Sequence, residues 1–368
     1  MERLDVELVR SLAGVRAQHA AISCYLGLDP SIVPNDSALA THVTSLVDEA
    51  RVAGASDEDA GRIEHFLTTE LDRDGIAGVG LFLSDLPHAS HEVALAQPVE
   101  DRVYVERSFV LGPLLPLLER GRDVVLVAVG RDRGSIWLVR DGRPRDVDEL
   151  SRDGQGQHDQ GGWSQARYAR ARDKEARDHM ADVAAAVATA IPQGSIRLLA
   201  VACLEEQRSS FEELLEPHVR DILIGWIDVE AHASADDLLP AVERLLDEQI
   251  AREQNALVEH WLEERGQRSG RATDSWDATL AAAADGSVES LLLLDRQGAE
   301  AFECPQCGRG YVAAGRCDLD GTTLEQAPGG AGEVAARATL LNGGEVRVLD
   351  AGLDGAEVAA LLRYPQAT

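Results

Sequence analysis

Several kinds of segment are absent from this chain of 368 residues, and each absence removes a class of function. No apolar run reaches the about 18 residues that suggest a membrane-spanning helix. The first residues lack the basic and apolar parts of a secretory signal. The sequence also has no Walker loop, no His-Glu-x-x-His pair and no dinucleotide fingerprint after a strand-like run. We therefore expect a cytoplasmic protein that has no membrane contact and does not use the chemistry of those three motifs.

Lysine is nearly absent, and negative charge is in excess. Lys174 is the single lysine among 35 basic residues, and the net charge is −29. Such an excess of acid argues against a nucleic-acid partner. The stretch 119–177 is an exception, because it carries 13 basic and 11 acidic residues. Electrostatic attraction depends on local patches, so an acidic protein with one basic region can still bind phosphate there.

Cysteine is also scarce, with five residues in the chain. Cys24 and Cys203 lie in apolar, strand-like runs and are expected to be buried thiols. The other three are clustered within 303–325. This distribution fits a metal site in a reducing compartment better than it fits a disulfide framework.

The clustered cysteines have the spacing of a zinc ribbon. Cys304 and Cys307 are three residues apart, and Cys317 is three residues before Asp320. A glycine follows each pair and permits a tight turn, so that both ends of each pair can point at one metal ion. No histidine follows His260, so Asp320 has to supply the fourth ligand. We expect a structural zinc ion on these four residues; the alternative is a degenerate ribbon without metal.

The order of strand-like and helical patterns predicts an α/β protein of three mixed domains, with the zinc-ribbon-like insertion in the last. The expected domains are 1–118, 119–268 and 269–368. Strands are expected at 21–28, 78–84, 124–129, 135–140, 197–204, 222–229, 290–294 and 346–349. Helices are expected at 37–53, 57–73, 164–190, 207–216, 236–265, 274–284, 331–341 and 355–363.

A glycine-rich loop and the helix after it are the most distinctive features of the middle domain. Residues 153–162 contain four glycines and no aliphatic side chain, so we expect the loop 153–163 to be mobile when free. In the helix, an apolar face and a cationic face are offset from one another. The apolar face holds Ala169, Ala176, Met180, Val183 and Val187, and the cationic face holds Arg167, Arg170, Lys174 and Arg177. The positive end of the helix also favours phosphate. A solvated arginine face beside a surface loop is the alternative interpretation.

The junction of loop and helix resembles a known family. Gly161-Gly162-Trp163-Ser164, followed by Arg167, Tyr168, Ala169, Arg170 and Arg172, is similar to the segment in which eukaryotic and archaeal class-1 release factors carry Gly-Gly-Gln-Ser before an arginine-rich helix. The order of strands and helices from about 123 to 294 resembles the middle and C-terminal domains of these factors. The resemblance is closest to their bacterial branch, which includes the Balon-type ribosome hibernation factors.

Two departures from the family pattern bear on function. Trp163 stands where the family has the glutamine that helps water release the peptide from transfer RNA. An indole has no amide and cannot orient water in this way. The family's stop-codon motif, Asn-Ile-Lys-Ser, is also missing, because residues 1–118 contain no lysine. The resemblance therefore implies a factor that binds the ribosome without catalysing peptide release.

The resemblance also implies a binding site and partners. The factor would occupy the aminoacyl site during stress and block the peptidyl transferase centre, with ribosomal RNA and peptidyl-transfer RNA as neighbours and elongation factor Tu as a possible delivery partner. The loop tip would be Gly161, Gly162, Trp163 and Ser164, with Arg167, Arg170, Arg172 and Lys174 on phosphates. Trp163 can stack on a base or ribose, or it can instead anchor the loop on its own domain.

Two other functions stay open. A rearranged loop could present Gln155, Gln157, Gln160 or Gln165 and give a peptidyl-tRNA hydrolase or release factor that acts in ribosome rescue. The chain could also be a stress protein that binds another protein and has no ribosomal contact.

Overall fold

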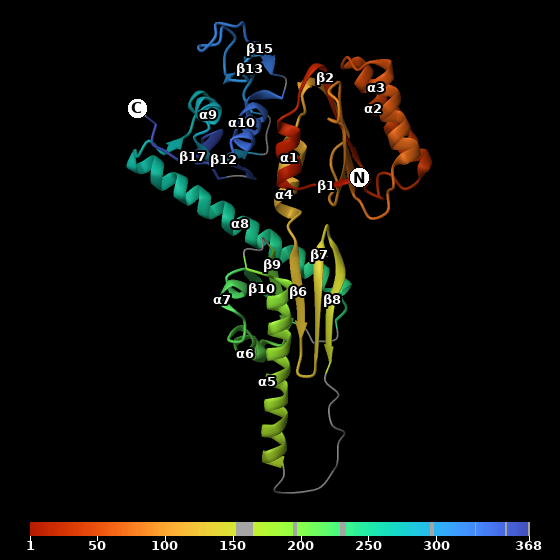
Figure 1. The fold of residues 1–368 in the computed structure, drawn as a ribbon, viewed down its shortest axis with the longest axis vertical. Coiled ribbons are helices and arrows are strands. Elements are labelled where there is room, and N and C mark those ends of the chain that lie inside the picture. The colour runs from red at the N-terminus through yellow and green to blue at the C-terminus, as the bar shows by residue number, and fades with distance from the viewer. Residues whose placement is uncertain are drawn as a thin grey trace. The chain divides into compact units, whose positions relative to one another are not determined.

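The computed structural model describes residues 1–151, 165–193, 197–228, 233–294, 298–327, 329–349 and 352–366. They divide into two compact units (Figure 1). Unit 1 contains Met1–Glu119 and Glu253–Thr368, and unit 2 contains Arg120–Arg252. The α/β class predicted from the sequence is confirmed, since every sheet is packed against helices or lies beside them.

The first part of unit 1 is a five-stranded sheet in the order β1-β4-β3-β2-β5. Its strands are β1 (Glu2–Arg3), β2 (Arg16–Gly27), β3 (Gly78–Ser84), β4 (His91–Leu95) and β5 (Arg102–Ser108). The helices are α1 (Val6–Ala13), α2 (Asp36–Val52) and α3 (Asp57–His65), the last continued by a π-helical turn, Phe66–Glu70. Side-chain oxygens of Asn35 and Ser56 accept backbone N–H bonds at the starts of α2 and α3, so the sequence itself sets where these helices begin.

The last part of unit 1 contains a four-stranded sheet in the order β11-β17-β12-β16 and a small sheet in the order β14-β13-β15. The four strands are β11 (Ala272–Thr273), β12 (Val288–Leu294), β16 (Glu345–Leu349) and β17 (Val358–Leu362). The small sheet has β13 (Ala301–Glu303), β14 (Gly310–Tyr311) and β15 (Glu325–Ala327). Helices α9 (Trp276–Ala284) and α10 (Gly330–Leu341) pack on one face of the larger sheet, and the fully buried Trp261 of α8 (Ala235–Gln267) packs on the other.

The two parts of unit 1 share one hydrophobic core. Leu12, Phe109 and Leu114 pack in the same cluster as Leu280 and Leu340. Leu114 lies in a short 3-10 turn, Gly112–Leu114, that leads into α4 (Leu115–Arg120). Burial of this apolar surface is the main force that holds the two sequence-distant parts together.

A five-stranded sheet in the order β10-β9-β6-β7-β8 forms the centre of unit 2. Its strands are β6 (Val124–Val129), β7 (Arg133–Arg140), β8 (Arg143–Ser151), β9 (Leu198–Cys203) and β10 (Leu223–Asp228). On one face lie α5 (Gln165–Ala190), α6 (Arg208–Glu212) and α7 (Pro217–Arg220), with the 3-10 turn Glu205–Gln207 before α6. The first half of α8 covers the other face.

Two glycines let the long helices of unit 2 approach the sheet closely. A Cβ atom added at Gly134 would lie 2.4 Å from Val183 Cγ2 on α5. A Cβ atom added at Gly225 would lie 2.5 Å from Leu245 Cδ2 on α8. Neither distance is compatible with normal van der Waals packing, so an added side chain there would force Val183 or Leu245 to move.

Most predicted elements are present, but one prediction was wrong. The helix predicted at 355–363 is strand β17, which lies between β11 and β12. All five residues of this strand are buried, so they cover both faces of the sheet, and an apolar run without alternation cannot be told from a buried helix by its pattern. The predicted division into three domains stays a prediction. Among the described residues, no helix has the length and hydrophobicity needed to cross a membrane.

Candidate functional site

Helix α5 connects β8 to β9 and packs on the sheet of unit 2 through residues in its second half. Met180, Val183, Ala184 and Val187 are buried in the core of unit 2, and Ala176 is half-buried beside them. Figure 1 shows the first turns of α5 continuing past the ends of β6 and β7. The predicted apolar face is thus confirmed for these residues.

The N-terminal half of α5 carries exposed cations. Arg172, Lys174 and Arg177 are all exposed. None of the three forms an ion pair with another residue that the structure describes, although Glu175 and Asp178 lie on the same helix. Exposed cations of this kind suit an anionic partner such as a phosphate backbone.

The other predicted site residues can be placed only in part. Gly161, Gly162, Trp163 and Ser164 lie outside the described residues, as do the loop glutamines 155, 157 and 160. Arg167 and Arg170 lie within α5, and their side chains are outside the described part. Arg172 and Lys174 are therefore the two predicted contacts whose exposure the structure describes.

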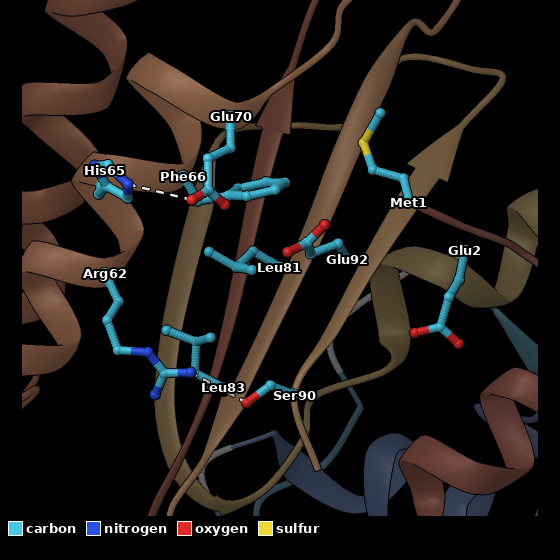
Figure 2. Close-up of a pocket in the computed structure, with 10 residues that line it drawn as sticks. All are labelled: Met1, Glu2, Arg62, His65, Phe66, Glu70, Leu81, Leu83, Ser90 and Glu92. Atoms are coloured by element: carbon cyan, nitrogen blue, oxygen red, sulfur yellow. Dashed lines mark hydrogen bonds and ion pairs between the residues drawn. The ribbon is translucent and has the colours of Figure 1, made fainter. Parts of the chain in front are cut away.

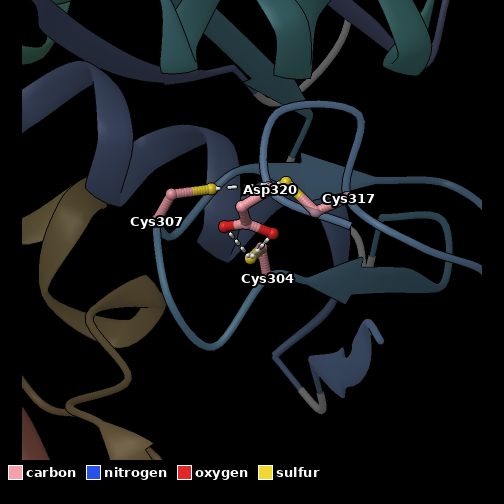
Figure 3. A group of neighbouring side chains, drawn as sticks. All are labelled: Cys304, Cys307, Cys317 and Asp320. Carbon is pink, nitrogen blue, oxygen red and sulfur yellow. Dashed lines mark hydrogen bonds between the residues drawn. The ribbon is translucent and has the colours of Figure 1, made fainter. Parts of the chain in front are cut away.

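The predicted metal ligands are brought together by the fold. Cys304, Cys307, Cys317 and Asp320 each direct a ligand atom to one point, with all four atoms within 4.8 Å of one another (Figure 3). The Cys307 and Cys317 Sγ atoms are 3.6 Å apart, and Cys304 Sγ is 3.4 Å from Asp320 Oδ2. Three sulfur ligands and a carboxylate at this spacing form a group that could hold a metal ion.

Two tight turns hold the ligand pairs in place. The Gly308 N–H donates to the Cys304 carbonyl, and the Gly321 N–H donates to the Cys317 carbonyl, both at 2.9 Å. Gly308 has φ +77° and Gly321 has φ +73°, a left-handed conformation that side chains disfavour. The two glycines singled out in the sequence are therefore required by the turns that place the four ligands.

Hydrogen bonds tune the protonation of this group. The Thr322 N–H donates to Asp320 Oδ1 at 2.8 Å and lowers the pKa of that carboxyl below its usual value. The Tyr311 hydroxyl donates to Cys317 Sγ at 3.5 Å and lowers the pKa of this thiol. Partial burial raises the pKa of Cys307 to about 11. Both lowered pKa values favour the anionic forms that bind metal.

The remaining two cysteines lie away from this group. Cys24 in β2 is 1% exposed and Cys203 in β9 is 0% exposed, so the prediction that they are buried thiols is confirmed. Burial raises the pKa of Cys203 to about 11 and that of Cys24 further. Neither thiol is suited to act as a nucleophile or redox centre, because both are held in the neutral form.

A surface cavity in unit 1 was not found from the sequence. It has a volume of about 450 Å³ and lies beside α3, β3 and β4 (Figure 2). Four of its polar residues pair with one another: His65 Nε2 is 3.2 Å from Glu70, and Arg62 donates to Ser90 Oγ at 3.3 Å. The residues come from segments far apart in the sequence, and no motif marks them: Met1, Glu2, Arg62, His65, Phe66, Glu70, Leu81, Leu83, Ser90 and Glu92.

Comparison with known families bears on unit 2. Residues 110–246 match the family model described as bacterial archaeo-eukaryotic release factor family 10. This range includes all five strands of the unit 2 sheet, α5 and the first turns of α8. The resemblance that the Gly161–Arg172 segment indicated is therefore supported for these matched residues, which make up less than half of the chain.

Comparison with other proteins gives weaker similarities. Pelota from Archaeoglobus fulgidus is 15% identical, with a TM-score of 0.37, over 78% of this chain and 79% of that one. Dom34 from S. cerevisiae is 10% identical, with a TM-score of 0.44, over 98% and 94%. A chain of the structure described as a model of ribosome-bound archaeal Pelota and ABCE1 is 15% identical, with a TM-score of 0.44, over 99% and 96%. No curated protein matches the sequence.

Proposed function

We propose that this protein is a ribosome-binding factor of the release factor superfamily that occupies the aminoacyl site and blocks the peptidyl transferase centre without chemistry. The match of residues 110–246 to a release factor family model supports a role in translation on the ribosome. The observation that carries the proposal is the start of α5, where Arg172, Lys174 and Arg177 are exposed and unpaired among the described residues. In a protein of net charge −29, three such cations on the N-terminal half of one helix are a group well suited to ribosomal RNA phosphates.

The lack of chemistry is proposed from the loop residue Trp163. An indole N–H can donate one hydrogen bond but has no carbonyl oxygen to accept one from water. A glutamine side chain has both groups, and orienting water for attack on an ester needs such positioning. The aromatic face of Trp163 is better suited to stacking on a base or ribose. Gly161, Gly162 and Ser164 would bring it close to RNA, with Arg167 and Arg170 on nearby phosphates.

The physiological setting is part of the same proposal. A factor that blocks the reaction centre without turnover would act as a hibernation factor under stress, in the cytoplasm, where ribosomes work. Elongation factor Tu is the proposed delivery partner. Capture of elongation factor Tu by the tagged full-length chain, in the presence of GTP, tests this part separately.

We further propose that the metal bound by Cys304, Cys307, Cys317 and Asp320 is zinc in a structural role. Zinc prefers a tetrahedral set of cysteine and similar ligands, and a closed set of four protein ligands leaves no open position for substrate. The four converging ligand atoms and the two glycine turns support this assignment. Metal analysis of the protein purified without added metal should find about one zinc per chain; iron in its place, or no metal, would overturn it.

Ribosome binding is tested by co-sedimentation of the full-length chain with vacant bacterial ribosomes over a range of salt. The wild-type protein should sediment with ribosomes at low salt, and binding should weaken steeply as salt rises. The double variant Arg172→Glu and Lys174→Glu should bind at least about tenfold more weakly and with a shallower salt dependence, because it loses phosphate contacts.

The matched control changes charge equally at another surface. Arg244 and Arg268 are exposed, and their side chains form no ion pair with another described residue. The double variant Arg244→Glu and Arg268→Glu therefore alters net charge by the same amount and should bind as the wild type does. Equal loss in both variants would mean that net charge, and not α5, governs binding. Wild-type protein that does not sediment with ribosomes at low salt would favour a protein-binding function without ribosomal contact.

A second candidate function rests on the glutamines near the loop. Gln155, Gln157, Gln160 and Gln165 lie within ten residues of Trp163, and one of them could orient water if the loop rearranged on the ribosome. Peptide release from ribosomes that carry peptidyl-transfer RNA distinguishes the two functions. Release that depends on the protein and is abolished when one of these glutamines becomes alanine would establish the hydrolase and overturn the inert factor.

A further inference from the structure

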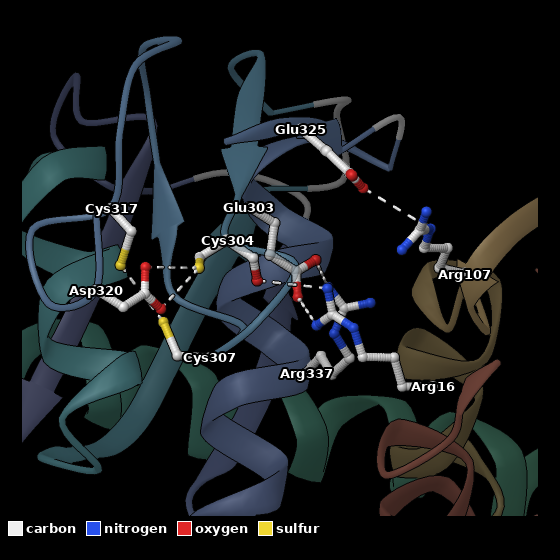
Figure 4. A network of polar contacts seen from close by, with 9 residues as sticks. All are labelled: Arg16, Arg107, Glu303, Cys304, Cys307, Cys317, Asp320, Glu325 and Arg337. Atoms are coloured by element: carbon white, nitrogen blue, oxygen red, sulfur yellow. Dashed lines mark hydrogen bonds and ion pairs between the residues drawn. The ribbon is translucent and has the colours of Figure 1, made fainter. Parts of the chain in front are cut away.

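Unit 1 contains a polar network that connects the metal-binding group to the start of β2 (Figure 4). The Glu303 carboxylate accepts from two arginines: Arg16 Nη1 donates to Oε1, and Arg337 Nη2 donates to Oε2, both at 2.7 Å. The side chain of Glu303 is 13% exposed and that of Arg337 is 12% exposed, so the pair is shielded from solvent. Arg16 and Glu303 are 287 residues apart in the sequence.

Arg16 also contacts the first ligand turn directly. Its Nη2 donates to the Cys304 carbonyl at 3.4 Å, and this is the carbonyl that accepts the turn-closing bond from the Gly308 N–H. Arg16 Nη1 lies so close that a Cβ atom at Gly308 would be 3.5 Å from it. One guanidinium therefore binds both the residue before the first ligand and the backbone of that ligand.

The part of β2 that carries Arg16 depends on such contacts. Pairing between β2 and β5 changes register between Arg16 and Ala21, so the ladder there is irregular. The N–H groups of Gln18 and His19 donate to the Asp85 carboxylate, at 3.1 and 2.8 Å. A strand segment without a continuous ladder is held by its side-chain contacts, and Arg16 supplies those at its start.

We propose that metal binding by Cys304, Cys307, Cys317 and Asp320 is thermodynamically linked to the docking of residues 16–20 through Arg16 and Glu303. The linkage rests on the metal site proposed above. A bound ion fixes the first ligand turn, and with it the Cys304 carbonyl and the neighbouring Glu303 carboxylate. Arg16 then meets both acceptors in one orientation and anchors the start of β2.

Metal binding and the Arg16 contacts must strengthen each other equally. If the metal strengthens the Arg16 contacts, then the Arg16 contacts must strengthen metal binding by the same factor. An arginine outside the ligand set thus becomes a determinant of metal affinity, although it carries a positive charge that would otherwise repel a cation. A simple electrostatic effect has the opposite sign: removal of a nearby positive charge would tighten zinc binding.

The experiment measures zinc affinity of the full-length chain by competition with a chromophoric chelator. Arg16→Met keeps the aliphatic part of the side chain and removes the guanidinium. It should weaken zinc binding by roughly three- to tenfold, the range expected for a partly shielded ion pair in a coupled site. The control is Arg73→Met, which removes an arginine that pairs with Asp36 elsewhere in unit 1. Arg73→Met should leave the affinity within about twofold.

Amide hydrogen exchange of residues 16–20 provides a second measurement. In the wild-type protein, removal of zinc by chelator should speed exchange in this segment, and in Arg16→Met exchange should be fast with and without zinc. Arg16→Lys is the milder variant if Arg16→Met does not fold; it keeps the charge but cannot reach both acceptors at once, and it should show a smaller change in the same direction.

These measurements distinguish failure of the proposed metal site from failure of the proposed linkage. Wild-type protein that binds no zinc overturns the metal site and the linkage together. Wild-type protein that binds zinc, with affinity unchanged or tightened in Arg16→Met and with exchange of residues 16–20 independent of zinc, overturns the linkage alone.

Discussion

Two groups of cations, one in each unit, have different surroundings. In unit 1, Arg16, Arg337 and Arg347 lie against carboxylates that are themselves mostly buried, such as Glu303 and Glu119. In unit 2, Arg172, Lys174 and Arg177 extend from α5 with no ion pair to any other described residue. Arginines of the first kind connect parts of the same chain. Cations of the second kind are available to a partner.

Whether a cation is paired and shielded, or exposed and unpaired, predicts the effect of its replacement better than the net charge of the protein does. A shielded pair such as Arg347 with Glu119, at 2.5 Å, leaves a buried charge uncompensated if either partner is removed. An exposed cation contributes little to folding, so its replacement changes stability by less than about 0.5 kcal/mol. Substitutions in unit 1 should therefore affect stability, and substitutions at the start of α5 should affect binding.

Loss of a metal ligand should have the largest effect on unit 1. Cys304→Ser removes a fully buried thiol from the ligand set, and structural zinc contributes directly to folding. We expect unit 1 to lose several kcal/mol of stability, with faster amide exchange in 301–327 and little change in unit 2. Addition of a chelator to the wild-type protein should reproduce the pattern. Equal loosening of β6, β7 and α5 would contradict the separation of the two units.

Removal of the Glu333 carboxylate should cause the second-largest loss of stability. Its two oxygens accept the N–H groups of Leu111 and Gly112, at 2.8 and 2.9 Å, where the first part of unit 1 leads into α4. Glu333→Ala leaves the buried Leu111 N–H without an acceptor and should cost about 2–4 kcal/mol. Denaturant unfolding followed by tryptophan fluorescence measures this loss. The exposed Glu345→Ala, whose carboxylate pairs with Arg347 at the surface, is the control and should cost less than about 1 kcal/mol.

Glu333 should also make the free energy of unfolding depend on pH. Burial raises the pKa of Glu333 above its ordinary value of 4.5, so the folded protein binds this proton more tightly than the unfolded chain does. Its contribution to stability is full below the ordinary pKa and is lost as pH rises through the raised pKa. Glu333→Gln cannot titrate, so the free energy of unfolding of this variant, relative to wild type, should rise as pH rises above 4.5. A difference that falls, or stays constant, with pH would contradict the raised pKa.

Crowding of α5 against its sheet should have a smaller effect, confined to unit 2. Gly134→Ala would place a Cβ atom 2.4 Å from Val183 Cγ2, so Val183 has to move, and we expect α5 to shift away from β7 with it. We expect a cost of about 1–3 kcal/mol and weaker ribosome binding, because the exposed start of the helix moves with it. Unchanged stability would mean that Val183 can move aside without displacing the helix.

The smallest predicted effect is an increase in stability, where the substitutions above decrease it. Gly61 lies inside α3, and a Cβ atom there would meet nothing within 4 Å. Gly61→Ala should therefore stabilise unit 1 by about 0.5–1 kcal/mol, since alanine favours a helix and glycine does not. With Gly134→Ala it forms a matched pair: the same chemical change, in the two units, with opposite results in thermal unfolding.

Elements with a strong local pattern were predicted well from the sequence. The helix expected at 164–190 is α5, Gln165–Ala190, and the strand expected at 124–129 is β6 with the same bounds. The four metal ligands converge as their spacing and following glycines indicated. In each case the signal lies within a few residues: an apolar period, a β-branched run or a turn glycine.

Elements without such a pattern were missed. β8, Arg143–Ser151, is an edge strand rich in charged residues, and it is defined by its pairing with β7 instead of by apolar alternation. β17 was predicted as a helix because its alanine and leucine residues are apolar without alternation. The Arg16 to Glu303 contact depends on two segments at opposite ends of the chain, and no local pattern can reveal such a pair. The cavity beside α3 was missed for the same reason.

The central claim is that α5 and the loop before it enter the ribosomal aminoacyl site. A photoreactive benzoylphenylalanine in place of Trp163, in the full-length chain bound to vacant bacterial ribosomes, tests this claim most directly. We predict crosslinks to large-subunit RNA at the peptidyl transferase centre, which are lost when aminoacyl-transfer RNA fills the site or when Arg172 and Lys174 are changed to glutamate. Crosslinks only to ribosomal proteins at the surface, or none that aminoacyl-transfer RNA displaces, would contradict it.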